Sequence, residues 1–186
     1  MKLAHTCIHT LFAACIATGC TSNSDAKANG IEGFSKNQEV HIPLVAKDLK
    51  LDPRLSTGLA ATNIARLLFE GLTYIDENGK IFPGMAHDIQ ISSDLKSYTF
   101  SLRDAEWSNG DKVKTSDFEY AWMSALNPEM KAPGAYMLFP IKNAQNYFEG
   151  KASYDDVGIH ALDDKTLVVN LESPSPYFLQ LTATSM

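Results

Sequence analysis

Several short stretches of the chain alternate between hydrophobic and polar residues. The clearest stretch places Tyr98, Phe100 and Leu102 on one side of an extended chain and Thr99 and Ser101 on the other. A period of two is typical of a half-buried strand. Two other stretches flank an Asp-Asp-Lys turn, which indicates a hairpin. The strands predicted in this way are residues 40–45, 89–91, 98–102, 157–161 and 166–171.

The hydrophobic period changes after the turn that follows Trp107, where Asn109 and Gly110 tolerate the positive φ of a sharp turn. Apolar residues then recur three and four positions apart, which predicts a helix with one apolar face. The residues of this face are Phe118, Ala121, Trp122, Ala125 and Leu126. We expect both Trp107 and Trp122 to be buried in the core.

The ends of this helix carry their own signals. Thr115 or Ser116 can cap it by accepting a bond from a free backbone N–H, and Ser116 with Glu119 has the spacing of a capping box. Pro128 ends the helix, because proline has no amide hydrogen with which to continue it. A short helix is predicted later, at residues 143–148. An earlier helix is predicted from an apolar face made of Ala60, Ile64, Leu67 and Leu68.

The first residues differ in composition from the rest of the chain. Lys2 precedes a mostly apolar run that is too short to span a membrane, which needs about 20 apolar residues. We therefore predict an export signal at residues 1–19. The signal is followed by Cys20 in an Ala-Thr-Gly-Cys sequence, which resembles a bacterial lipobox and predicts lipidation of that cysteine. The alternative is an ordinary signal peptide with an incidental cysteine.

The residues after the signal predict a tether without disulfides. Residues 20–36 are rich in Ser, Asn, Ala, Gly and Lys and offer little to bury, so we expect them to be flexible. Cys7 and Cys15 would be removed with the signal. Cys20 would then be the only cysteine of the mature chain, which excludes an intramolecular disulfide.

Composition and charge exclude several classes of function. The 186 residues, 45% of them hydrophobic, can bury the core of one domain, or of one domain and part of another. The net charge of −6, with scattered basic residues, argues against nucleic-acid binding. The motifs of serine hydrolases, zinc proteases and phosphate-binding loops are absent, and His41, His87 and His160 lack the spacing of metal ligands. We expect neither an enzyme nor a bound cofactor.

The predicted strand, turn and helix around Trp107 carry a run of motifs in a fixed order. Their residues are Leu102, Arg103, Ala105, Trp107, Ser108, Asn109, Gly110, Val113, Asp117 and Phe118. This order resembles the signature of the extracellular solute-binding proteins of family 5, which serve peptide ABC transporters. Lys114 and Thr115 stand where that family usually has Thr-Ala.

Further motifs extend the resemblance from residue 51 to residue 181. They are Leu-Asp-Pro at 51–53, Leu-Phe-Glu-Gly-Leu at 68–72, Pro-Gly-x-Ala at 83–86, the hairpin at 157–171 and Pro-x-Pro-Tyr-Phe at 174–178. Members of the family are far longer, with a discontinuous outer lobe, an inserted domain and a second lobe that closes over the ligand. The resemblance implies a mixed α/β fold of the periplasmic-binding-protein type II, incomplete here. Residues 37–69 would be the first piece of the outer lobe, and residues 70–186 most of the inserted domain.

The resemblance also implies a function. The whole protein would capture oligopeptides in the periplasm or at the cell surface, anchored by lipid to a bacterial membrane, and deliver them to the permease subunits of an ABC transporter. The residues carried over to the ligand cleft are Arg54, Thr57, Gly58, Leu59, Gly134 and Tyr136. Thr57 is uncharged where relatives can place an acidic side chain, and Gly134 stands where relatives can present an aromatic one.

Alternatives to peptide transport stay open. One is a protein of the same family that binds a nickel complex, haem or another small solute, with His87 or His160 involved. Another is a truncated gene product without a transport role. In this family the residues that pair with a peptide's charged ends lie largely in the second lobe, so we expect this chain alone to bind peptides weakly. Glu70 is expected to be a partly buried structural carboxylate.

Overall fold

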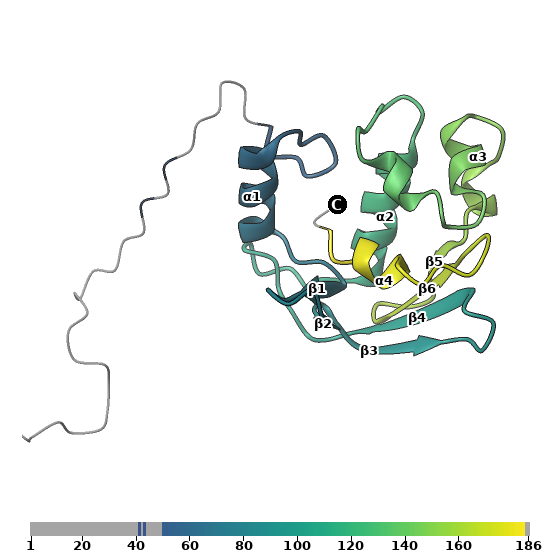
Figure 1. Cartoon of the computed structure of the whole chain (residues 1–186), viewed down its shortest axis with the longest axis horizontal. Helices are drawn as coiled ribbons and strands as arrows, with labels where there is room; N and C mark the ends of the chain where they lie inside the picture. The colour runs from purple at the N-terminus through teal and green to yellow at the C-terminus, as the bar shows by residue number, and fades with distance from the viewer. Residues whose placement is uncertain (1–40, 42, 44–49, 185–186) are drawn as a thin grey trace, which may run out of the picture. The chain divides into compact units, whose positions relative to one another are not determined.

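An antiparallel sheet of four strands forms one layer of the fold (Figure 1). The strands lie in the order β3-β4-β6-β5, and their bounds are β3 Ala86–Ile91, β4 Ser97–Leu102, β5 Ile159–Ala161 and β6 Thr166–Asn170. Every neighbouring pair is antiparallel. The predicted strands in this part of the chain are therefore confirmed, including the hairpin of β5 and β6.

The computed structural model describes His41, Pro43 and residues 50–184. The predicted strand at 40–45 lies almost wholly outside these residues, as do the signal, the tether and Cys20. Residues 50–184 belong to a single unit of the chain. No helix within the described residues is long and apolar enough to cross a membrane.

The alternation of β4 decides which face of the sheet carries the core. Tyr98 of β4 lies opposite Val169 of β6, and Phe100 lies opposite Leu167. Phe100, Leu167 and Val169 are fully buried, and Tyr98 is nearly so. Facing apolar pairs of this kind are the basic stabilising unit of a sheet. The sheet therefore offers one continuous apolar face to the helices.

Helices cover this apolar face (Figure 1). Their bounds are α2 Thr115–Leu126, the 3-10 helix η1 Ala135–Leu138, α3 Ala144–Phe148 and α4 Phe178–Leu181, with a second 3-10 turn, η2, at Tyr154–Asp156. Trp122, Ala125 and Leu126 of α2 are buried, as the helical pattern predicted. Asn127 follows the helix with an extended backbone, and Pro128 comes next, as expected.

The start of α2 differs from the prediction. Lys114 is the cap residue, and its backbone N–H donates to Oδ2 of Asp117 at 3.0 Å. Thr115 begins the helix and donates its hydroxyl to the backbone oxygen of Asp163. The predicted capping box of Ser116 and Glu119 is therefore wrong. A carboxylate in the first turn serves instead, since it accepts a free N–H and lies near the positive end of the helix dipole.

Two smaller elements precede the sheet in the chain. They are the helix α1 at Leu59–Leu68 and a hairpin of β1 Thr73–Ile75 with β2 Ile81–Pro83. The helix was predicted, but its buried residues are Ala61 and Ala65, whereas Leu67 and Leu68 are 69% and 59% exposed. A sequence pattern tells which apolar residues share a side of a helix. Only the neighbouring parts of the fold decide which side is covered.

Two glycines allow three backbone segments to meet closely. A Cβ on Gly84 would lie 2.7 Å from the oxygen of Gly71, and a Cβ on Gly71 would lie 2.6 Å from the oxygen of Thr182. The N–H of Gly84 donates to the oxygen of Leu72 at 3.0 Å, and the N–H of Thr73 donates to that of Thr182 at 3.3 Å. No side chain fits between these segments, so the crossing requires glycine at both positions. We call this arrangement the glycine crossing.

Candidate functional site

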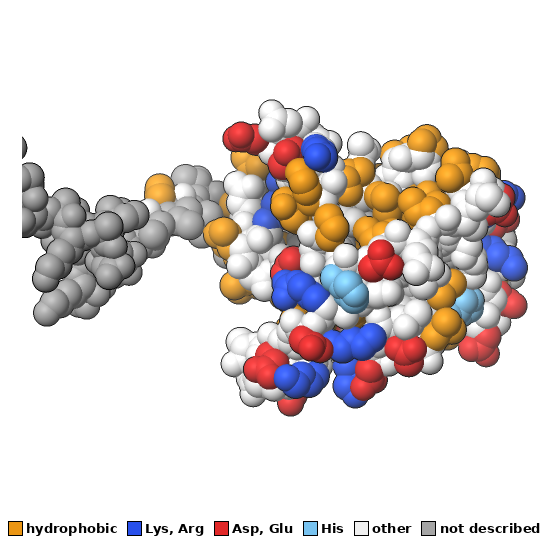
Figure 2. Space-filling view, turned by 90° about the horizontal axis from the view of Figure 1, so that it is seen from below, with side chains coloured by type: hydrophobic (Ala, Val, Ile, Leu, Met, Phe, Trp, Pro, Cys, Tyr) orange, Lys and Arg blue, Asp and Glu red, His pale blue; other side chains and the backbone are white. Residues whose placement is uncertain are grey.

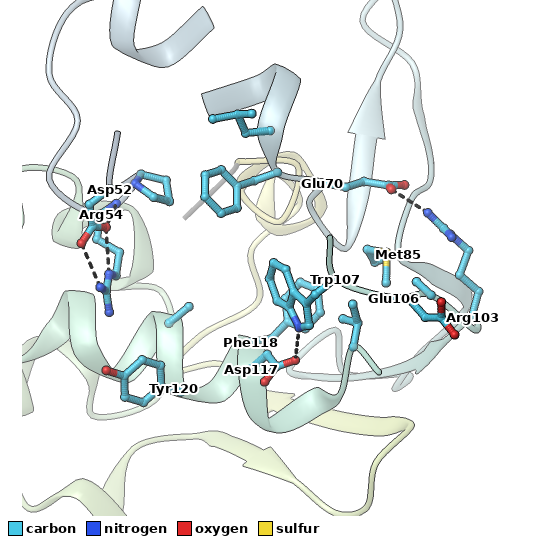
Figure 3. Close-up of a pocket in the computed structure, with 16 residues that line it drawn as sticks. Asp52, Arg54, Glu70, Met85, Arg103, Glu106, Trp107, Asp117, Phe118 and Tyr120 are labelled. Atoms are coloured by element: carbon cyan, nitrogen blue, oxygen red, sulfur yellow. Dashed lines mark hydrogen bonds and ion pairs between the residues drawn. The ribbon is translucent and has the colours of Figure 1, made fainter. Parts of the chain in front are cut away.

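A cavity of about 690 Å³ opens beside the first half of α2 (Figure 3). Its lining comes from the segment before α1, the end of α1 with the residues that follow it, Met85 just before β3, the connection from β4 to α2, and the first half of α2 itself. Its walls are mostly apolar and include Phe69, Met85, Trp107, Val113 and Phe118. The volume and the apolar lining are those of a pocket for a small ligand or an apolar side chain.

Trp107 stands in the wall of this cavity. Its indole Nε1 donates a hydrogen bond to Oδ2 of Asp117 at 3.0 Å, and the residue is 41% exposed. The prediction that Trp107 is buried in the core is therefore wrong. Trp107 lies beyond the end of β4, next to a tight turn in which Gly110 has φ of +91°, so its ring faces the cavity instead of the core beneath the sheet.

Arg54 lies on the opposite side of the cavity and is held by Asp52 (Figure 3). Its Nε donates to Oδ1 of Asp52 at 2.9 Å, and its Nη2 donates to Oδ2 at 2.8 Å. The guanidinium carbon also lies 5.7 Å from the ring centre of Tyr120 on α2. The hydrogen bond from Arg54 holds the pKa of Asp52 below its ordinary value, and the same bond raises the pKa of Arg54.

A second ion pair joins the residues after α1 to the end of β4. Nη2 of Arg103 lies 2.6 Å from Oε2 of Glu70, and Nε of Arg103 donates to the backbone oxygen of Gly84 at 3.2 Å. Glu70 is thus a structural carboxylate, as expected, although it lies at an exposed place, with 46% of its side chain accessible. An exposed pair of this kind contributes at most about 1 kcal/mol to stability.

Charged side chains elsewhere on the surface are paired in the same way. Figure 2 shows acidic and basic side chains intermingled on one face of the molecule. Lys165 lies 2.8 Å from Asp104, and Lys112 lies 2.6 Å from Glu106. Hydrogen bonds from these lysines hold the pKa of each carboxyl below its ordinary value. A mixed surface of this kind lacks the one-signed field that attracts nucleic acid.

The chemistry of the lining favours binding over catalysis. The residues that line the cavity include no Ser, Thr, Cys, His or Lys, so they do not form a hydroxyl or thiol nucleophile with a histidine or lysine base. Each lining carboxylate already accepts a bond or an ion pair from a neighbour in the chain, as Asp52 does from Arg54. Within the part of the chain that the structure describes, no three His, Cys, Asp or Glu residues are grouped to hold a metal ion. The cavity can therefore hold an apolar group between aromatic side chains.

The residues carried over to the ligand cleft lie at two places. Arg54 is the one among them that lines the cavity. Leu59 begins α1 and is 78% exposed, and Tyr136 lies in η1 and is 65% exposed. The others are Thr57, Gly58 and Gly134, which lie outside the lining. Their part in binding a ligand stays a prediction.

Sequence reasoning missed Tyr120. This residue is not part of the apolar face of α2 and is 67% exposed, yet its ring meets Arg54 across the mouth of the cavity. The signal that could have found it is an aromatic residue on the polar side of an amphipathic helix, where a charged residue is usual.

Comparison with known sequences gives the family to which this fold and cavity belong. Residues 80–185 match the family described as bacterial extracellular solute-binding proteins, family 5 Middle. The chain belongs to this family.

Individual relatives are longer than this chain. The oligopeptide-binding protein OppA of Bacillus subtilis is 42% identical over 175 residues, which are 93% of this chain and 31% of the relative. The chain thus spans about a third of that relative's length.

Solved structures agree with this family membership. The substrate-binding domain of an oligopeptide ABC transporter from Bacillus anthracis matches with a TM-score of 0.70 and 41% identity, covering 73% of this chain and 26% of that one. OppA of Haemophilus influenzae, solved in complex with RPPGFSPFR, matches with a TM-score of 0.69 and 39% identity, covering 73% and 27%. These matches confirm the expected mixed α/β fold as a part of a larger solute-binding protein.

Proposed function

We propose that this chain is part of the substrate-binding component of a peptide ABC importer, which captures oligopeptides and delivers them to the permease. The observation that carries the proposal is the match, at 39% identity, to a binding protein solved with a peptide. The 42% identity to an oligopeptide-binding protein along nearly the whole of this chain supports it.

The exposed segment that leads into α1 is the part that we assign to the peptide. An extended peptide has free backbone N–H and C=O groups, and a binding protein gains affinity for any sequence by pairing with them. The N–H groups of Thr57 and Leu59 make no hydrogen bond within the described residues and are free to donate. Gly58, at φ +85°, sets the direction of the chain between them. Bridging waters then allow varied side chains.

We further propose the domain division and the anchor that the resemblance implies. Residues 37–69 belong to the outer lobe and residues 70–186 to an inserted domain. Cys20 carries the lipid that holds the mature protein at the periplasmic or outer side of a bacterial membrane. Two acyl chains anchor a protein stably, whereas a single chain is marginal.

A hybrid protein tests the peptide function. Residues 51–184 of this chain replace the matching segment of OppA from Bacillus subtilis, and calorimetry measures the binding of a pool of short peptides, nickel and haem in separate titrations. We expect peptide affinity within about tenfold of the unmodified OppA, and much weaker binding by this chain alone. A folded hybrid that binds nickel or haem in place of peptides, or that binds nothing, contradicts the proposal.

A further inference from the structure

The residues before α1 form a turn that is closed by its own side chains. The carboxylate of Asp52 accepts the backbone N–H of Arg54 at 3.0 Å as well as two bonds from its guanidinium. The hydroxyl of Ser56 lies 2.8 Å from the backbone oxygen of Asp52 and 2.9 Å from the backbone oxygen of Lys50. The backbone N–H of Leu55 donates to the backbone oxygen of Asp52 at 3.0 Å. A planar guanidinium held by two bonds keeps a fixed orientation.

The guanidinium of Arg54 joins the turn to α2. It lies over the ring of Tyr120 within the range of a cation–π interaction, which extends to about 6 Å from the ring centre. Tyr120 projects from the polar side of α2, so the contact joins two elements across the mouth of the cavity (Figure 3). We call Asp52, Arg54 and Tyr120 the clamp.

We propose that Arg54 is a positioning residue of the peptide site and not a partner of the peptide's carboxylate. Only Leu55 and Ser56 separate Arg54 from Thr57, so the clamp fixes where the N–H groups of Thr57 and Leu59 lie relative to α2. The Nε and Nη2 edge of Arg54 is already occupied by Asp52, and a carboxylate that took this edge would leave Asp52 with only the backbone N–H of Arg54. The inference rests on the proposed function for what the segment binds, and on the contacts described above for the clamp itself.

Peptides with free and with amidated C-termini separate the two roles in the hybrid protein. We expect Arg54→Ala and Tyr120→Leu each to weaken binding by about three- to tenfold, equally for both kinds of peptide. The double variant should lose no more than the larger single loss, because both changes break one contact. Tyr120→Phe, which keeps the ring, should restore the affinity. Lys151→Ala, which breaks a similar surface pair with Glu149 far along the chain, is the matched control.

The inference is overturned if Arg54→Ala weakens the binding only of peptides with a free carboxylate. It is also overturned if the losses of affinity in Arg54→Ala and Tyr120→Leu add up in the double variant, or if neither single variant changes peptide binding. NMR on the 186-residue chain keeps the clamp testable should the hybrid fail to bind peptides. There Tyr120→Leu should shift the Nε–H signal of Arg54 and the amide signals of Thr57 and Leu59. Amide signals of these two residues that do not move overturn the inference independently of the proposed function.

Discussion

Trp107 donates its indole N–H to Oδ2 of Asp117 at 3.0 Å. The same oxygen accepts the backbone N–H of Lys114 at 3.0 Å, at the start of α2. One carboxylate therefore both caps the helix and orients an aromatic wall of the cavity.

Replacing this carboxylate should affect the helix and the cavity together. We expect Asp117→Ala to lower the free energy of unfolding by about 1 to 3 kcal/mol, because the cap and the bond to Trp107 are both lost. The fluorescence of Trp107 should shift as well. Ser116→Ala is the control, since Ser116 is exposed and does not cap. An equal loss in both variants, measured by urea denaturation, would restore the capping box that the sequence predicted.

The two tryptophans should differ in their effect on stability. Trp122 is 3% exposed, so Trp122→Ala leaves a cavity in the core and should cost about 3 to 5 kcal/mol. Trp107→Ala should cost clearly less, because that residue is 41% exposed. Denaturant midpoints of a fragment of residues 37–186 measure both. A Trp122→Ala midpoint equal to that of the unmodified fragment would show that the face of α2 is not part of a core.

The backbone donor at Leu59 can be removed without breaking the helix. Leu59 is the first residue of α1, the position at which proline is best tolerated. We expect Leu59→Pro in the hybrid to weaken peptide binding by about tenfold, since one bond to the peptide is lost. Leu59→Ala keeps the N–H and serves as the matched control. Equal affinities of the two variants would mean that this N–H does not meet the peptide.

The clamp should weaken in acid. Arg54 lowers the pKa of Asp52 from its ordinary value of 3.8, so the ionised form is favoured in the folded chain. The stabilisation is then fully present above the pKa that Asp52 has in the unfolded chain. It is lost as the pH falls through the lowered pKa that Asp52 has in the folded chain. We expect the stability difference between the chain and Asp52→Asn to be present at about pH 6 and to shrink below about pH 4. The effect should be small because the pair is partly exposed. A difference that does not vary with pH in urea denaturation contradicts this assignment.

Lipidation of Cys20 can be tested in bacteria that express the whole chain. The expectation rests on the Ala-Thr-Gly-Cys sequence at the end of the apolar run. Labelled fatty acid should enter the unmodified protein, and Cys20→Ala should carry none. Label of equal strength on both proteins would show that Cys20 is not the lipidated residue, and no label on either would leave an ordinary signal peptide as the explanation.

Local signals in the sequence predicted most of the elements of this fold. The alternation of β4 and the helical spacing of α2 depend on neighbours within a few residues, and both were confirmed. The exposure of Trp107 depends on where the chain runs after β4, which a local pattern does not contain. The exposure of Leu67 and Leu68 in α1 likewise depends on which parts of the fold lie beside the helix, and a local pattern does not contain this information.

The candidate site was less accessible to sequence reasoning, because its parts come from distant segments. Arg54 was assigned to the ligand cleft by resemblance, and the structure places it on the cavity. Its contact with Tyr120 joins two segments that are far apart in the chain, and no periodicity connects them. Contacts of this kind are set by the fold as a whole.

The glycine crossing ties the two ends of a long segment together. Besides the backbone bond between Thr73 and Thr182, their hydroxyls lie 2.9 Å apart, and both reach the oxygen of Leu179. A segment whose two ends lie close together can be inserted into another protein as a cassette, because the chain of that host protein is interrupted at only one place. Exchanging this cassette between relatives should therefore leave the framework of the host undisturbed.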